Sequence, residues 1–341
     1  MSDELLESAM RRALALAQNG PRGINPQVGC VILSPADEII AEGWHRGVGT
    51  PHAEADALAT LTPDQTRGAT AVVTLEPCNH HGHTGPCSVA LIESGIARVV
   101  YAIDDPTPEA HGGAARLREA GIEVVPHVLA DDVRAFLADW LFVATHGRPH
   151  VTLKWAMTLD GRIAAADGTS QWISSPEARA AVHTLRELSD AVLVGTGTII
   201  ADDPALTARG PGGDLLAHQP VPVVVGERAV PAAARLFDHP VEPILEPTRD
   251  LAAALADLAA RGILTVLAEP GPTLGAALVK ADLVDRLEVF LGPGLLGGPN
   301  TALGDLGVGT IADKKAFAIV KHAVVGDSIW VRAERADEKE S

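Results

Sequence analysis

Residues 76–87 read EPCNHHGHTGPC and hold two cysteines and three histidines, all of which are side chains that bind zinc. An H-x-E pattern, from His52 to Glu54, precedes this stretch. Catalytic zinc sites use three protein ligands and leave a fourth position to water. In zinc deaminases, H-x-E followed by P-C-x-x-C supplies those ligands, and the glutamate moves protons without binding the metal. The pattern therefore predicts zinc on His52, Cys78 and Cys87. It assigns proton transfer to Glu54.

The interval between the cysteines departs from that signature, because eight residues separate Cys78 from Cys87 instead of two. Cys87 follows Gly-Pro at the predicted start of a helix, where the helix dipole helps to hold a thiolate. One alternative is a closed structural Cys₂His₂ site completed by His80, His81 or His83, which would leave no position for water. A structural site does not need the glutamate of H-x-E, so we prefer the catalytic interpretation.

Alternating helices and strands must position these residues. Apolar spacing and turn residues predict the elements of the first half. Helices are expected at 4–19, 52–61, from 87 onward and at 113–120, and strands at 28–34, 39–45, 69–76, 98–105 and 122–128. The stretch 145–150 interrupts the alternation, so it is the predicted domain boundary.

A second alternating set follows that boundary. Strands are expected at 151–158, 190–195, 222–226, 263–269, 288–293 and 328–333, and helices at 176–189, 250–261 and 276–284. The alternation predicts an α/β fold in both halves. We expect one domain over residues 1–146, a second over 149–335, and a charged tail over 336–341.

The composition restricts the class of protein. A length of 341 residues allows two domains with separate cores. The net charge of −17 argues against nucleic-acid binding, because a phosphate backbone requires a basic surface. The acidic N-terminus and the lack of an apolar run of about 18 residues predict neither a signal peptide nor a transmembrane helix. Three cysteines make no disulfide framework, which favours a cytoplasmic protein without a membrane partner.

The run AVVTLEPCNHHGHTGPC (71–87), with HAE upstream and DDPTP downstream, resembles the deaminase half of the bifunctional riboflavin-biosynthesis deaminase–reductase. The eight-residue interval between the cysteines is typical of that family. The resemblance implies a cytidine-deaminase-like three-layer domain, with zinc on the three ligands named above and Glu54 as proton shuttle. It also implies substrate contacts from Asn25, His45, His80 and His83.

The second half lacks the G-x-G-x-x-G fingerprint of a Rossmann dinucleotide site after its first strand. Two glycine turns, 195–199 and 270–278, lie instead between a strand and a predicted helix. Such turns bring backbone N–H groups close to a phosphate. Glycine turns are also ordinary connectors in α/β folds, so these two alone leave the ligand open.

Three blocks, 153–174, 194–209 and 269–278, resemble the reductase half of the same enzymes, which has a dihydrofolate-reductase-like fold and binds NADPH. The implied NADPH contacts are Ala156, Trp172, Thr198, Asp202, Gly271, Pro272, Thr273, Leu274, Gly275, Ala276 and Ala277. The implied substrate contacts are Ser170, Arg186, Leu206, Arg209 and Glu269. These residue types suit the implied ligands, because the two arginines can bind a ribose phosphate and Trp172 offers a flat apolar wall to a nicotinamide ring.

Several positions depart from the family pattern. His83 stands where Lys or Arg is usual, which makes a phosphate contact weaker and dependent on pH. Gly85 and Pro270 also replace the usual residues. The segment that carries Glu227 and Arg228 is shorter than in the family and lacks its Asp-Ser pair. Glu227 would disfavour a 2′-phosphate and Arg228 would favour it, so the preference for NADPH over NADH rests on the resemblance alone.

The two resemblances together predict an enzyme for consecutive steps of riboflavin biosynthesis. The first step is hydrolytic deamination of 2,5-diamino-6-ribosylamino-4(3H)-pyrimidinone 5′-phosphate. The second is NADPH reduction of the ribosyl group to ribityl, giving 5-amino-6-ribitylaminouracil 5′-phosphate. One zinc ion, NADPH, phosphorylated pyrimidines and further copies of the chain, as a dimer or tetramer, are the expected partners. The alternatives are a zinc deaminase of another substrate with a degenerate reductase half, and a structural-zinc protein that senses a nucleotide.

Overall fold

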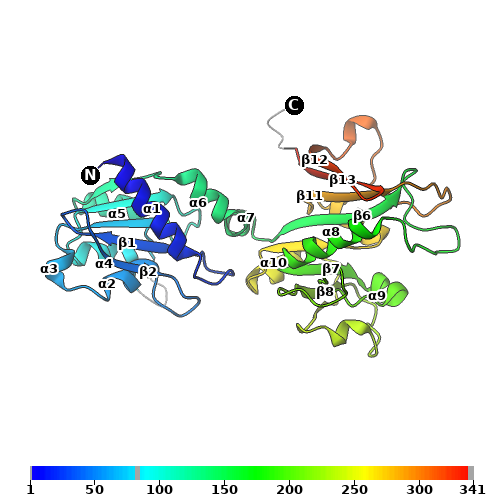
Figure 1. The fold of residues 1–341 in the computed structure, drawn as a ribbon, viewed down its shortest axis with the longest axis horizontal. Coiled ribbons are helices and arrows are strands. Elements are labelled where there is room, and N and C mark those ends of the chain that lie inside the picture. The colour runs from blue at the N-terminus through cyan, green and yellow to red at the C-terminus, as the bar shows by residue number, and fades with distance from the viewer. Residues whose placement is uncertain (1, 81–84, 337–341) are drawn as a thin grey trace. The chain divides into compact units, whose positions relative to one another are not determined.

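The computed structural model describes residues 2–80 and 85–336, which divide into two compact units (Figure 1). The first unit comprises residues 1–147 and 260–262, and the second comprises 148–259 and 263–341. Each unit has its own β-sheet. Among the helices of the described residues, none is long and apolar enough to cross a membrane.

The first unit holds a five-stranded sheet in the order β2-β1-β3-β4-β5. β1 pairs antiparallel with β2 and β3, whereas β3, β4 and β5 run parallel. The strands are β1 (Gly29–Leu33), β2 (Ile39–Trp44), β3 (Thr70–Leu75), β4 (Arg98–Ile103) and β5 (Glu123–Val125). The helices are α1 (Asp3–Ala17), α2 (Ala53–Leu58), α3 (Pro63–Thr66), α4 (Cys87–Glu93), α5 (Gly113–Glu119), α6 (Ala130–Phe136) and α7 (Ala138–His146).

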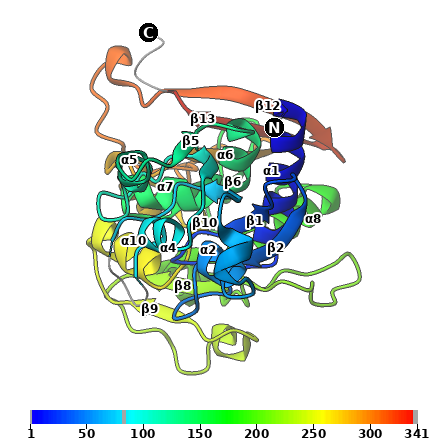
Figure 2. The same ribbon diagram turned by 90° about the vertical axis from the view of Figure 1, so that its left-hand side faces the viewer.

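Helices cover both faces of this sheet (Figures 1 and 2). α1 packs so closely on one face that a Cβ on Gly29 would lie 1.9 Å from the Ala13 carbonyl oxygen. Cys30 and Ile32 project from the opposite face, because side chains alternate along a strand. They share a buried core with residues of α2, α4 and α5. The helix–sheet–helix layers confirm the predicted three-layer fold of this half.

The second unit holds an eight-stranded sheet in the order β12-β13-β11-β6-β10-β7-β8-β9. The six strands from β11 to β9 run parallel, and β12 and β13 form an antiparallel hairpin at one edge. The strands are β6 (His150–Thr158), β7 (Ala191–Gly195), β8 (Val221–Val225), β9 (Ile244–Glu246), β10 (Thr265–Ala268), β11 (Arg286–Gly292), β12 (Phe317–Val325) and β13 (Ser328–Arg335). The α-helices are α8 (Pro176–Glu187), α9 (Thr196–Asp202), α10 (Leu251–Ala260) and α11 (Pro272–Lys280).

The carboxyl ends of the central strands of this sheet lie side by side. In the strand register, Ala268 of β10 stands beside Leu153 of β6 and Leu193 of β7, and Gly195 of β7 stands beside Val225 of β8. Ligands of open parallel sheets bind at this edge. The glycine turns that follow β7 and β10 therefore meet at the edge where a ligand is expected.

Three elements of the second unit differ from the sequence prediction, and one of them is the short strand β9, which was not predicted. The helix expected at 276–284 begins at Pro272, because proline suits the first turn of a helix. β12 was not predicted, although Gly326 and Asp327 form a two-residue turn signal between apolar runs. β12 lies at the sheet edge and is mostly exposed, so its apolar residues follow no core-facing alternation.

The helices α6 and α7 were also absent from the sequence prediction. Each has one fully buried residue, Val133 in α6 and Trp140 in α7. A helix is recognised in a sequence by an apolar stripe at a spacing of three to four residues. With a single buried residue each, these two helices carry too little of that pattern.

Candidate active site

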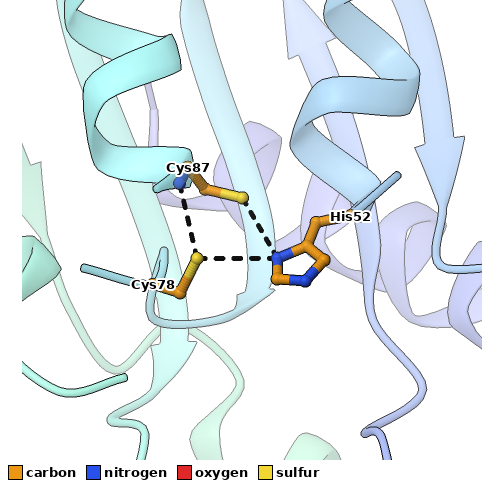
Figure 3. A group of neighbouring side chains, drawn as sticks. All are labelled: His52, Cys78 and Cys87. Carbon is orange, nitrogen blue, oxygen red and sulfur yellow. Dashed lines mark hydrogen bonds between the residues drawn. The ribbon is translucent and has the colours of Figure 1, made fainter. Parts of the chain in front are cut away.

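Three side chains from separate elements converge in the first unit (Figure 3). His52 directly precedes α2, Cys78 follows β3, and Cys87 is the first residue of α4. His52 Nδ1 lies 3.5 Å from Cys78 Sγ and 3.3 Å from Cys87 Sγ, and the three atoms lie within 4.8 Å of one another. Tetrahedral zinc places nitrogen and sulfur ligands about 3.6 Å apart. The donor types and their spacing therefore fit one zinc ion.

The two thiols of this site differ in acidity. A hydrogen bond from the Cys87 thiol, joined by His52 and the Cys87 backbone N–H, lowers the pKa of the Cys78 thiol, although burial raises it. The same thiol hydrogen bond and burial raise the pKa of Cys87. The protein's own groups therefore favour one thiolate, and a bound divalent cation favours deprotonation of the second.

Glu54 lies in the first turn of α2, two residues after His52, and is only 3% exposed. Burial, followed by the nearby Cys78, raises the pKa of its carboxyl group, although hydrogen bonds and His52 lower it. Glu54, His52 and Cys78 line one cavity of about 220 Å³. A buried carboxyl group with a raised pKa, placed beside metal ligands, suits the transfer of protons.

Asn25, His45 and His80 line the same cavity. Nδ1 of His45 lies 3.1 Å from the Pro51 carbonyl oxygen, so Nδ1 carries the proton and Nε2 accepts from Asn25 Nδ2 at 2.9 Å. Nδ1 of His80 is buried and has no hydrogen-bond partner among the described residues. Three of the predicted substrate contacts therefore share one cavity with the zinc ligands His52 and Cys78, whereas His83 lies outside the described residues.

The cavity also has walls to which the sequence interpretation gave no role: Glu76, Asp105 and Trp140. Glu76 accepts hydrogen bonds from the backbone N–H groups of Asp105, at 3.3 Å, and Ala114, at 2.9 Å. Asp105 accepts two hydrogen bonds from Thr107. Both carboxylates stand just after parallel strands, which was the available sequence signal for them.

The loop that carries Cys78 is held by close backbone packing. A Cβ on Gly113, the first residue of α5, would lie 1.7 Å from the Pro77 carbonyl oxygen. The Ser88 backbone N–H donates to the Cys78 carbonyl oxygen at 3.1 Å, and the Asn79 backbone N–H donates to that of Ala110 at 2.9 Å. Helices α4 and α5 therefore fix the backbone on both sides of this cysteine.

In the second unit, the two glycine turns lie against each other. A Cβ on Gly195 would lie 3.3 Å from Leu274 Cδ2, and one on Gly271 would lie 3.9 Å from Thr198 Oγ1. The predicted NADPH contacts thus group at the starts of α9 and α11. The remaining ones are Ala156 in β6, Asp202 at the end of α9, and Trp172, which is 69% exposed and lies under the Arg179 guanidinium.

Glu269, at the end of β10, is the centre of a buried charge cluster. Arg186 donates to it through Nε at 2.6 Å and Nη2 at 3.1 Å, and Lys154 Nζ lies 3.5 Å away. Burial raises the pKa of Glu269, but Arg186 and Lys154 outweigh it and lower that pKa to about 2. Arg186 also donates to the Thr207 carbonyl oxygen at 3.0 Å. Its guanidinium is therefore already engaged by the protein, and Lys154 is a neighbour that the sequence interpretation missed.

The other predicted substrate contacts of this unit are placed as follows. Arg209 is half-buried, and its Nε donates to Thr207 Oγ1 at 2.8 Å. Within residues 2–80 and 85–336, it forms no ion pair. Leu206 is buried and Ser170 is exposed. Two arginines were predicted to bind phosphate. Of these, Arg209 is the one whose guanidinium still has N–H groups that the described residues do not engage.

Comparison with known proteins covers both units. The family of RibD C-terminal domains matches residues 149–329, and the cytidine and deoxycytidylate deaminase zinc-binding region matches residues 3–103. The riboflavin biosynthesis protein RibD of Mycobacterium tuberculosis strain H37Rv is 47% identical over 289 residues, which are 84% of each chain. The chain belongs to the RibD family. The RibD protein of Escherichia coli K12 is 38% identical and covers 95% of this chain and 97% of its own.

Solved RibD structures have the same fold over nearly the whole chain. Acinetobacter baumannii RibD, form 2, gives a TM-score of 0.77 at 33% identity and covers 98% of this chain and 99% of its own. A diaminohydroxyphosphoribosylaminopyrimidine deaminase/5-amino-6-(5-phosphoribosylamino)uracil reductase from Thermotoga maritima gives 0.73 at 32% identity, with the same coverage. These similarities confirm the family that the sequence motifs of both halves predicted.

Proposed function

We propose that this RibD-family chain catalyses two consecutive steps of riboflavin biosynthesis: deamination of the diaminopyrimidine phosphate and NADPH reduction of its ribosyl group. The observation that carries the proposal is the triangle of His52, Cys78 and Cys87, with a buried Glu54 that lines the same cavity as His52 and Cys78. A purely structural zinc site would gain nothing from a desolvated carboxyl group next to its ligands. The arrangement therefore favours a catalytic site.

Zinc held by these three residues would act as a Lewis acid and lower the pKa of a water molecule in its open position. Glu54 takes up the two protons of the attacking water one after the other at its carboxylate. It delivers the first to the ring nitrogen as the C–O bond forms, and the second to the departing amino group as the C–N bond breaks. Because Glu54 is buried, bulk water has little access to it. The protons therefore pass directly between its carboxyl group and the reactants in the cavity.

Asn25, His45 and His80 bind the pyrimidine phosphate in this proposal. The Asn25–His45 hydrogen bond presents a fixed polar edge to the ring, and the unpartnered Nδ1 of His80 is available to a substrate oxygen. His80 and His83 together bind the phosphate group of the substrate.

In the reductase half, NADPH supplies the hydride, and the protein orients it and holds the substrate. The turns around Thr198 and Gly271 would hold the cofactor, and Trp172 would offer a flat apolar wall to its nicotinamide ring. Arg209 binds the ribose phosphate, whereas Arg186 orients Glu269 toward the substrate. The remaining NADPH contacts and substrate contacts that the family resemblance implies are proposed to bind these same two ligands.

We assign deamination to residues 1–146 and reduction to 149–335, and we propose that the chain forms a homo-oligomer in the cytoplasm. β12 is an edge strand with exposed apolar residues, among them Ile319 (67%) and Val324 (77%). An open apolar edge favours pairing with another copy. Light scattering on the purified protein tests this, and a monomer at micromolar concentration contradicts it.

The function is tested with purified, zinc-loaded protein and the diaminopyrimidine phosphate. We expect release of ammonia, followed by oxidation of NADPH once the deaminated product forms. Ammonia release from a nucleoside alone, without NADPH oxidation, would indicate a deaminase of another substrate. Zinc binding with neither activity would indicate a structural site and contradict the proposal.

A further inference from the structure

Helix α7 reaches the deaminase cavity although it lies outside both regions that match the family descriptions, 3–103 and 149–329. Its residue Trp140 is 8% exposed and lines the cavity. The indole Nε1–H donates to the Ile24 carbonyl oxygen at 3.1 Å. One residue earlier, Asp139 accepts from Arg22 at 2.8 Å. α7 therefore contacts the segment that precedes Asn25 at two points, of which the exposed Asp139–Arg22 ion pair contributes little and the Trp140 hydrogen bond is the more buried one.

Asn25 continues this connection toward the zinc ligands. Its side chain donates to His45 Nε2, and His45 Nδ1 donates to the carbonyl oxygen of Pro51, the residue before His52. The rings of His45 and His52 meet edge to face, with centroids 5.5 Å apart. A continuous series of contacts thus runs from Trp140 through Ile24, Asn25 and His45 to a metal ligand.

We propose that Trp140 is a positioning residue for deamination. Its N–H fixes Ile24, and through it the Asn25–His45 pair, in the orientation that meets the pyrimidine ring. An indole suits this place because it combines a large apolar body with one donor. A polar edge fixed before binding loses less conformational freedom when substrate arrives, so it raises affinity. This role rests on the proposed deaminase function.

The substitution Trp140→Phe keeps an aromatic wall and removes the donor. We expect the KM for ammonia release to rise by up to about tenfold, because one partly buried hydrogen bond is lost. The kcat, the zinc content and NADPH oxidation with deaminated substrate stay within about twofold of wild type, because no zinc ligand is touched, and Tm falls by at most about 4 °C. Asp139→Asn is the matched control. It removes an ion pair that is 46% and 40% exposed, so KM should change less than about twofold.

Hydrogen exchange measures the positioning itself, independently of the substrate. Amides of residues 22–28 should exchange faster in Trp140→Phe than in Asp139→Asn. Unchanged exchange together with unchanged KM overturns the proposal. A parallel fall in kcat, zinc content and Tm also overturns it, because Trp140 would then only stabilise the fold. Failure of the wild type to release ammonia, with faster exchange in Trp140→Phe, counts against the proposed function and leaves the positioning intact.

Discussion

Glu54 is a buried carboxyl group that forms no ion pair with lysine or arginine in the described part of the chain. Burying such a group without a cation costs several kcal/mol, or raises its pKa until it is neutralised. Its neighbours explain why it is retained, since His52 and Cys78 line the same cavity. At the scale of single residues, the buried Glu54 carboxyl group destabilises the fold, and its role in proton transfer explains why it is present.

We predict that Glu54→Gln retains zinc but loses ammonia release by about 10²- to 10⁴-fold, the usual contribution of a general acid–base group. NADPH oxidation with deaminated substrate should persist. Metal analysis and the two assays on the same preparation check this. Loss of zinc from the variant would show that Glu54 is a ligand, contrary to its proposed role.

The zinc ligands could be predicted from the sequence because zinc chemistry limits residue type and approximate spacing. The roles of Glu76 and Trp140 could not be predicted in that way. Glu76 binds two backbone N–H groups and Trp140 binds a backbone carbonyl, and such partners are set by the fold. A carboxylate or an indole in a sequence does not reveal which backbone group it will meet.

At the scale of elements, α5 positions Cys78 through the close approach of Gly113 to Pro77. We predict that Gly113→Ala lowers zinc affinity by at least about tenfold, because a Cβ there must displace the backbone that carries a ligand. Gly85→Ala is the matched control, from the loop between the two cysteines, since an added Cβ at Gly85 meets no described residue within 4 Å. Competition with a chelator measures both affinities. Equal affinities in the two variants would show that α5 does not position the ligand.

The charge cluster around Glu269 predicts a dependence of stability on pH. Its pKa in the folded chain is about 2, below the ordinary 4.5, so the ion pairs stabilise the fold above about pH 4.5 and lose that effect as the pH falls toward 2. Glu269→Gln leaves Arg186 and Lys154 without their counter-ion. We expect it to lower the unfolding free energy by about 3 kcal/mol at pH 7. The difference from wild type should shrink toward pH 3, which urea unfolding at both pH values can detect.

Buried helices and strands were easier to predict from the sequence than exposed ones. Strands such as β3 and β7, buried at every position, were found from their apolar runs. The exposed β12 and the helices α6 and α7 carry weaker patterns and were missed. The start of α11 was misplaced because Pro272 indicates both a turn and the first turn of a helix.

At the scale of the molecule, each unit has its own sheet and its own buried core. The two-domain α/β organisation could be predicted because alternation of strands and helices extends over the whole sequence. The hairpin that ends the second sheet was only partly predicted, since one of its two strands lies exposed at the edge.

Separate cores predict that the two activities can be lost separately. Removal of zinc with a chelator should abolish ammonia release and leave NADPH oxidation with deaminated substrate within about twofold, because the described metal cluster lies wholly in the first unit. Added zinc should restore ammonia release. Parallel loss of both activities on chelation would mean that the reductase also depends on the metal.

The nitrogen ligand His52 directly precedes the short helix α2, whose first turn carries Glu54, while Cys78 and Cys87 are each anchored by their own packing. The distance between the reacting centre and its acid–base group is therefore independent of the length of chain that joins the cysteines. Insertions and deletions in that interval can alter which molecules the pocket accepts while the reaction itself is preserved. The range of substrates can therefore change, by natural substitution or by engineering, through exchange of the loop between Cys78 and Cys87.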